Sequence, residues 1–153
     1  MSSGEVLKRL LKEEITVLSR SSDLLRYSLD RSQKIELSTD MSHQEYEILD
    51  SFSSRFMRMY EVLTNQLLRT VLQVLAEHRD TWIDNMNQAE KMGFISSRKE
   101  MNEIRELRNM VAHEYLQEEW VHIYQRLLQK APVLLEMAQM TLDEMKRRKV
   151  LKS

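Results

Sequence analysis

The side chains best suited to chemistry lie in one short stretch of the sequence. Residues 106–115 read Glu-Leu-Arg-Asn-Met-Val-Ala-His-Glu-Tyr and contain four hydrogen-bonding side chains that could act on a phosphate: Arg108, Asn109, His113 and Tyr115. Imidazole is the side-chain type best suited to proton transfer near neutral pH, so His113 is the candidate general acid or base. The guanidinium of Arg108 is permanently charged, and its planar fork suits phosphate oxygens.

These residue types predict cleavage of a phosphodiester bond in RNA. The ribose 2′-hydroxyl is the nucleophile, His113 moves the proton and Arg108 stabilises charge on the phosphorane. Such a reaction leaves a cyclic or 3′-phosphate and does not need magnesium. We therefore expect no metal and no other cofactor. Asn109 is expected to orient the imidazole. A functional role and a packing role both stay open for Tyr115. In the first, its hydroxyl contacts a phosphate or is itself modified; in the second, its ring packs in the core.

Helix geometry limits how these groups meet. On one straight helix Arg108 and His113 point about 140° apart, so they cannot both reach one atom. Either the helix distorts near Val111 and Ala112, or a second chain completes the site. A two-fold dimer places the arginine of one chain beside the histidine of the other. We therefore infer a homodimer.

The elements that position this stretch are predicted to be helices. The sequence has 153 residues with two glycines, one proline and no cysteine. Abundant leucine, methionine, glutamate, arginine and glutamine favour helix almost throughout. We expect one domain over residues 1–153, an all-α antiparallel bundle of about five helices with a long N-terminal helical hairpin.

Capping patterns predict where most of these helices begin. Ser42 with Glu45, Thr81 with Asp84, and Ser97 with Glu100 have the spacing of a capping box. The expected helices span about 5–34, 42–77 and 81–92, then one from residue 97 that carries the motif, and one over 118–148. Pro132 is expected to kink or restart the last helix. The polar residues Arg55, Arg58, Asn65 and Arg69 lie close to the apolar stripe of the second helix, and the sequence does not select which of them faces a ligand.

Composition narrows the class further. Apolar residues make up 42% and charged residues 31%, with a net charge of −1, which is typical of a globular protein without a global attraction for nucleic acid. No apolar run approaches the roughly 20 residues of a membrane span. The N-terminus lacks the pattern of a signal peptide, so we expect a cytoplasmic protein with no membrane association. The basic stretch 146–153 is interpreted as a helix end followed by a frayed tail, or alternatively as a phosphate contact.

The other histidines are weaker candidates. His122 follows Glu118 at a spacing that suits a metal, but the sequence offers no third ligand nearby. His43 and His78 are interpreted as surface residues at helix ends.

The stretch Arg108-Asn109-Met110-Val111-Ala112-His113-Glu114-Tyr115 resembles the Arg-x4-His-x-Tyr motif of the HEPN superfamily. In particular it resembles the HEPN toxins that are paired with a minimal nucleotidyltransferase antitoxin. The order of the expected helices, with Gly93-Phe94-Ile95 closing the third, is similar over most of the chain.

The resemblance implies a toxin of a prokaryotic toxin–antitoxin pair, a metal-independent ribonuclease whose two motifs face each other across a dimer cleft. It implies that Arg108 and His113 are catalytic and that Asn109 supports them. It also implies that Tyr115 is the AMP acceptor when the nucleotidyltransferase partner silences the toxin. The alternative is a non-catalytic module that binds a nucleotide or RNA end for a separate nucleotidyltransferase; in that case His113 moves no proton.

Overall fold

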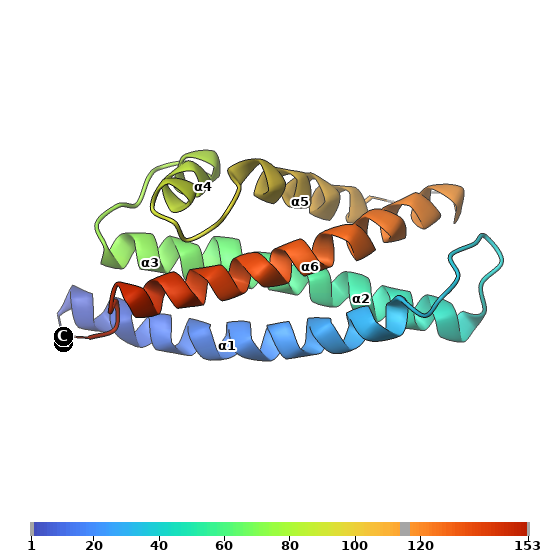
Figure 1. Ribbon diagram of the computed structural model, residues 1–153, viewed down its shortest axis with the longest axis horizontal. Helices are drawn as coiled ribbons and strands as arrows, with labels where there is room; N and C mark the ends of the chain where they lie inside the picture. Colours follow the sequence, from blue (N-terminus) through green and yellow to red (C-terminus); the bar gives the residue numbers. More distant parts are fainter. Residues whose placement is uncertain (1, 114–116, 153) are drawn as a thin grey trace.

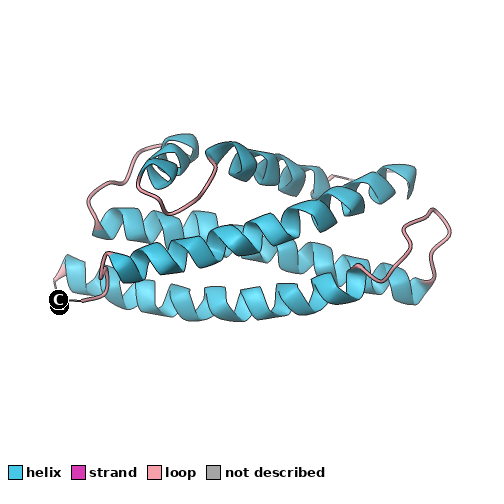
Figure 2. Cartoon of the chain, viewed as in Figure 1, coloured by secondary structure: helices cyan, strands magenta, loops and turns pink. Residues whose placement is uncertain are grey.

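The computed structural model describes residues 2–113 and 117–152, without the side chains of residues 117 and 118. Over these residues the chain is a bundle of helices and contains no strand (Figures 1 and 2), so the predicted all-α class is confirmed. The elements are α1 (Ser3–Ser32), α2 (His43–Glu61), the π-helical segment η1 (Val62–Leu67), α3 (Leu68–Val74), α4 (Trp82–Lys91), α5 (Arg98–Val111) and α6 (Gln117–Arg147).

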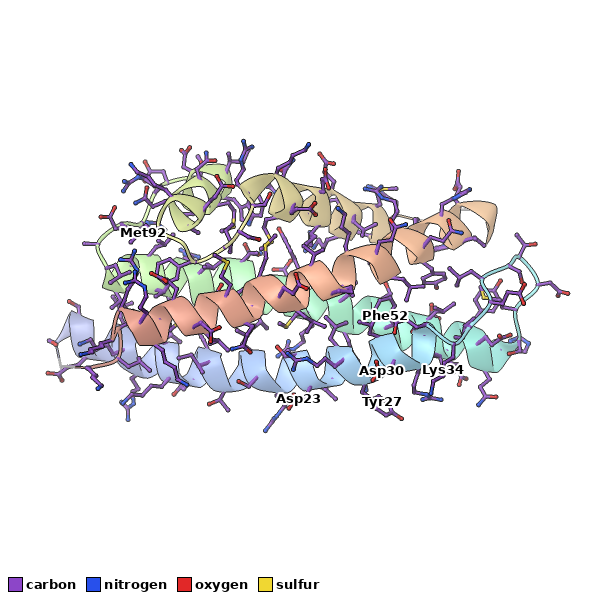
Figure 3. The ribbon with its side chains drawn as sticks, viewed as in Figure 1. Asp23, Tyr27, Asp30, Lys34, Phe52 and Met92 are labelled. Carbon is purple, nitrogen blue, oxygen red and sulfur yellow. The ribbon has the colours of Figure 1, made fainter. Side chains whose placement is uncertain are left out.

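The bundle is built on the predicted N-terminal hairpin. Helix α1 packs along α2, η1 and α3, while α6 crosses this pair and carries α5 on its other side (Figure 1). One hydrophobic core contains residues from every helix, including the fully buried Leu18, Phe52 and Leu107. Figure 3 shows Phe52 inside the bundle and Tyr27 on the outer side of α1.

The predicted helix starts are confirmed at three caps. The hydroxyl of Ser42 accepts the N–H of Glu45 at 3.1 Å, and the carboxylate of Glu45 accepts the N–H of Ser42 at 2.9 Å. Thr81 and Ser97 cap α4 and α5 in the same way, each accepting the N–H three residues later. These bonds satisfy N–H groups that have no partner inside the helix, which fixes where each helix begins.

The second predicted helix differs from the expectation in two ways. It ends at Val74, earlier than the predicted residue 77, and residues 62–67 are π-helical. The N–H of Leu68 bonds to the carbonyl of Leu63, five residues back, and the hydroxyl of Thr64 donates to the carbonyl of Tyr60 at 2.9 Å. A π turn is a local widening that is often found at functional sites. The helical course predicted from residue 42 is therefore confirmed as far as Val74, but the π-helical segment was not predicted.

Two expectations about the last helix need correction. Pro132 lies inside α6, so the helix does not restart there, and the alternative of a kink stays a prediction. As far as Lys152 the basic end is not frayed, because the N–H of Val150 donates to the carbonyl of Met145 and that of Lys149 to the carbonyl of Lys146, both at 3.1 Å. These two bonds form a Schellman turn, and the buried Met145 and Val150 make its hydrophobic contact. Lys8 then ties the tail to α1 by donating to the carbonyl of Lys152.

Candidate active site at the end of helix α5

The motif straddles the end of a helix. Helix α5 ends at Val111, and the following turn is closed by bonds from the N–H of Ala112 to the carbonyl of Asn109 (3.2 Å) and from the N–H of His113 to the carbonyl of Met110 (3.1 Å). Bonds to the third residue back tighten the end of a helix. The chain thus departs from α-helical geometry near Ala112, which is one of the two alternatives that the sequence left open. The angle of about 140° derived for a straight helix does not apply to His113.

Arg108 is held at the surface by a partner from another helix. Its Nη2 lies 2.8 Å from a carboxylate oxygen of Glu61, and its Nη1 donates to Oδ1 of Asn109 at 3.2 Å. Glu61 is the last residue of α2 and also accepts a bond from the amide of Asn65 at 2.6 Å. The side chains of the ion pair are 40% and 34% exposed, so the pair contributes at most about 1 kcal/mol to stability. Its main effect is to orient the guanidinium.

Aromatic packing positions the face of α5 that bears Arg108. The guanidinium of Arg105 lies 4.4 Å from the ring centre of Trp82, and the rings of Trp82 and Tyr60 are 6.4 Å apart. Burial raises the pKa of the Tyr60 hydroxyl, so this group is neutral at physiological pH. α2, α4 and α5 are therefore locked together one turn before the motif.

Helix α6 holds the opposite side of α5. Lys130 donates to the carboxylates of Glu100 and Glu103, at 2.7 Å in both cases, and the hydrogen bond to Glu100 is the main reason that the pKa of Lys130 is raised. Nearer the motif, Arg126 donates to the sulfur of Met110 at 3.3 Å. These contacts place a second arginine close to the end of α5.

The structure brings together some of the predicted site residues. Arg108 and Asn109 are in contact, and Asn109 orients the guanidinium; its predicted role in orienting the imidazole stays a prediction. His113 is exposed two residues beyond α5. Tyr115 lies outside the described residues. Glu61 was missed by sequence reasoning, since its only local signal is a four-residue spacing to Asn65.

The weaker candidates do not form a second centre in the described part of the chain. His43 is the first residue of α2, His78 follows α3, and His122 is exposed on α6. The side chain of Glu118, the proposed companion of His122, lies outside the description. In the described ranges, no group of three or more histidine, aspartate or glutamate side chains is placed to hold a metal ion.

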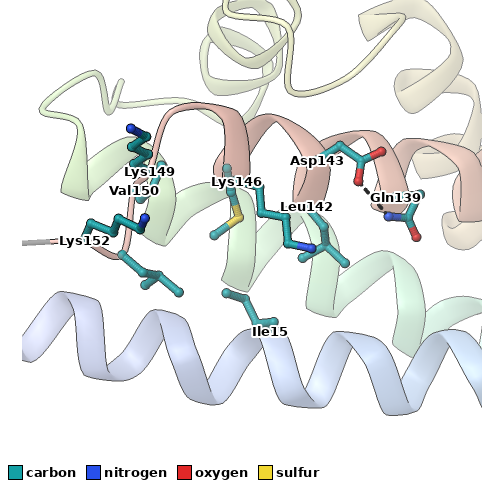
Figure 4. Close-up of a pocket in the computed structure, with 10 residues that line it drawn as sticks. Ile15, Gln139, Leu142, Asp143, Lys146, Lys149, Val150 and Lys152 are labelled. Carbon is teal, nitrogen blue, oxygen red and sulfur yellow. Dashed lines mark hydrogen bonds between the residues drawn. The ribbon is translucent and has the colours of Figure 1, made fainter.

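A cavity lies far from the motif. It has a volume of about 400 Å³ and sits between α1 and the C-terminal turn, with Ile15, Leu142 and Val150 among the residues that line it (Figure 4). At 1.5 Å per residue along α6, it is roughly 40 Å from the start of that helix. It holds none of the motif residues.

Among the described helices, none is long and apolar enough to cross a membrane.

The fold and the site define the protein as an all-α bundle with an Arg-Asn pair on the last turn of one helix and a histidine just beyond it. Comparisons with known protein families, with curated proteins and with solved structures found no match. The relationship to the HEPN superfamily therefore stays a prediction that rests on the motif.

Proposed function

We propose that the protein is a metal-independent endoribonuclease whose reacting groups are Arg108 and His113. The observation that carries the proposal is the arrangement at the end of α5. A guanidinium oriented by Glu61 and Asn109 lies on the last helical turn, and an exposed imidazole follows it within five residues. Two side chains of the described residues bond to Arg108, so some of its five N–H donors are available for a phosphate.

The reaction follows from these two groups. His113 accepts the proton of the ribose 2′-hydroxyl as the 2′-oxygen attacks the adjacent phosphorus. Arg108 stabilises the negative charge that develops on the phosphorane oxygens. The bond between phosphorus and the 5′-oxygen then breaks, and the leaving oxygen takes a proton from an imidazolium. The products are a 2′,3′-cyclic phosphate, or the 3′-phosphate formed from it by water, and a 5′-hydroxyl.

The biological setting we propose is the one implied by the motif. The protein is the toxin of a toxin–antitoxin pair in the cytoplasm, acts as a homodimer and is silenced by a minimal nucleotidyltransferase that transfers AMP to Tyr115. Support comes from the position of the motif at the end of α5, where a hydroxyl two residues after His113 lies near the reacting groups in sequence. The alternative proposal keeps Arg108 as the anchor of a nucleotide or RNA end but gives His113 no proton to move.

An RNA-cleavage assay in EDTA tests the proposal. Wild-type protein and the variants His113→Ala and His122→Ala are incubated with total RNA and with tRNA, and the product ends are identified. We expect cleavage by the wild type and by His122→Ala, the matched control, with loss of activity in His113→Ala. Absence of EDTA-resistant cleavage by folded wild type, with RNA binding retained, would favour the binding-module alternative.

A further inference from the structure

A second surface, lined by several arginines, lies between α1 and α2. Two concave pockets meet there because both are lined by Arg55. The first, about 260 Å³, is lined by Val17, Arg20, Ser21, Leu24, Ser54, Arg55 and Arg58. The second, about 220 Å³, is lined by Tyr27, Ser28, Arg31, Gln44, Glu47, Ile48, Ser51 and Arg55. Together they form one groove along the two helices, which we term the α1–α2 groove.

The groove carries excess positive charge although the whole chain has a net charge of −1. Four arginines line it against one acid, Glu47. None of the ion pairs among the described residues involves these four arginines. Arg55 is fixed in place because it donates to the hydroxyl of Ser28 at 2.7 Å and to the carbonyl of Leu24 at 3.4 Å. Serine hydroxyls from both helices add further hydrogen-bonding groups.

An exposed aromatic ring lies at the edge of this charge. Tyr27 is 57% exposed and projects from the outer side of α1 (Figure 3). The guanidinium groups of Arg31 and Arg55 lie 5.7 Å and 5.9 Å from its ring centre. Cations near its face orient the ring at the surface. A large exposed ring among arginines is the kind of platform on which unstacked bases bind.

We propose that the α1–α2 groove binds single-stranded RNA, with Arg20, Arg55 and Arg58 contacting phosphates and Tyr27 stacking on a base. The groove is concave and presents guanidinium and hydroxyl groups, which suit phosphates and sugars. A membrane surface instead requires an apolar helix face that protrudes into lipid. This inference rests on the proposed function for its substrate class, and it assigns binding to a surface separate from Arg108 and His113.

The groove and the candidate active site are connected through α2. Arg58 lies one turn before Glu61, the partner of Arg108, and about 60° from it around the helix axis. The lining residues of α1 run from Val17 to Arg31, which corresponds to roughly 20 Å of helix. A strand bound along this length and continued past Arg58 would reach Glu61 and the end of α5. The groove would thus add an extended contact surface beside the candidate active site.

The test measures RNA affinity without cleavage. A fluorescent oligouridylate is titrated with the full chain carrying His113→Ala, in EDTA and at several salt concentrations. Arg20→Gln with Arg58→Gln removes two charges from the groove; neither side chain makes a hydrogen bond or ion pair within the described residues. Lys91→Gln with Arg98→Gln is the matched control, because both side chains are exposed, on α4 and α5, and neither lines the groove. Circular dichroism confirms that each variant is folded.

Loss of two phosphate contacts should reduce the slope of log affinity against log salt by about 1.4, since each contact to a single strand contributes about 0.7. The control pair should leave the slope of the parent unchanged. Tyr27→Leu should weaken binding by about 5- to 100-fold at an unchanged slope, because base stacking depends little on salt, and Tyr27→Phe should retain the affinity.

The inference is overturned if the variant with Arg20→Gln and Arg58→Gln binds RNA as tightly as the control double variant does. It is also overturned if the protein binds anionic phosphatidylserine vesicles through Arg20 and Arg58 but does not bind RNA. The proposed function fails separately: wild-type protein that binds RNA through the groove without cleaving it refutes the nuclease and leaves the groove standing. Conversely, if wild-type protein cleaves RNA and the variant with Arg20→Gln and Arg58→Gln binds RNA normally, the groove is refuted and the nuclease stands.

Discussion

Three helices in the described part of the chain end in the same hydrogen-bonded turn, but only one of these turns has a glycine where the backbone needs a positive φ. Gly93 has φ 84° after α4, whereas Ala76 has φ 57° after α3 and Lys149 has φ 55° after α6. Each turn pairs two N–H groups with carbonyls near the helix end; after α3, for example, Glu77 donates to Leu72 at 2.8 Å. This left-handed position strains any residue with a Cβ.

Replacing the strained residues by glycine should stabilise the protein. The left-handed conformation costs an L-residue about 1–2 kcal/mol. The extra freedom of glycine in the unfolded chain offsets about 0.4–1 kcal/mol of that gain. Ala76→Gly and Lys149→Gly should therefore each raise the free energy of unfolding by about 0.5–1 kcal/mol, or Tm by about 1–4 °C for a domain of this size.

The reverse substitution should destabilise. A Cβ at Gly93 would lie 3.8 Å from the carboxyl carbon of Glu144, an ordinary contact, so only the φ penalty remains. Gly93→Ala should lower stability by about 0.5–1 kcal/mol. Lys146→Gly is the matched control, because it removes the same charge as Lys149→Gly from an exposed helical position; it should be destabilising by about 0.5–1 kcal/mol.

Urea and thermal unfolding of the full chain measure these changes. The reasoning is refuted if Lys149→Gly lowers stability as Lys146→Gly does, since relief of backbone strain predicts opposite signs for two lysine-to-glycine changes only three residues apart.

Three further predictions follow from buried or bridging groups. Burial raises the pKa of Glu14, whose carboxylate accepts a hydrogen bond from Thr70, so the folded protein binds the Glu14 proton more tightly than the unfolded chain does. The free energy of unfolding should therefore fall as pH rises above about 4. Glu14→Gln should remove this pH dependence when unfolding is measured across pH. Burial, followed by the hydrogen bond to Asp50, raises the pKa of the Tyr124 hydroxyl. The contribution of the neutral hydroxyl to the free energy of unfolding should therefore be present below about pH 10 and lost above it. Tyr124→Phe should remove this alkaline dependence and lower the free energy of unfolding by about 1 kcal/mol at neutral pH. Lys130→Met should cost about 1 kcal/mol and increase hydrogen exchange at the start of α5, because its two carboxylate partners tie α5 to α6.

The sequence predicts the helix starts because each is specified locally. Ser42, Thr81 and Ser97 each lie three residues before an acid, and the hydrogen bonds of the caps join atoms only a few residues apart. Gly93 likewise marks the end of α4 because only glycine adopts its φ without strain. The same rule failed after α3 and α6, where Ala76 and Lys149 occupy the left-handed position and give no warning in the sequence.

The unpredicted features depend on contacts between distant residues. A π turn shifts the hydrogen-bond register by one residue without changing the composition, so residues 62–67 look like any helix. The pair of Arg108 with Glu61 joins α5 to α2, and no spacing along the chain encodes it. The basic tail was interpreted as frayed because its charges are visible in the sequence, whereas the burial of Val150 arises only from the fold.

The end of α5 changes the basis of the predicted dimer. The dimer was inferred because Arg108 and His113 diverge on a straight helix. Because His113 lies beyond the helix end, the other alternative, a distortion near Ala112 within one chain, also accounts for the motif. A mixing experiment separates the two arrangements. Arg108→Gln and His113→Ala chains are each inactive under the proposed function, and they are unfolded together and refolded as a mixture.

In a dimer whose site combines the arginine of one chain with the histidine of the other, half of the dimers formed at random are mixed and each has one intact site. The mixture should then regain about a quarter of the wild-type cleavage rate. If both groups of a site come from one chain, every site lacks one of them and the mixture stays inactive. Sedimentation of the wild type fixes whether a dimer forms at all. Recovery near a quarter would restore the dimer on functional evidence, and an inactive mixture of proven dimers would place the complete site at the end of α5 in one chain.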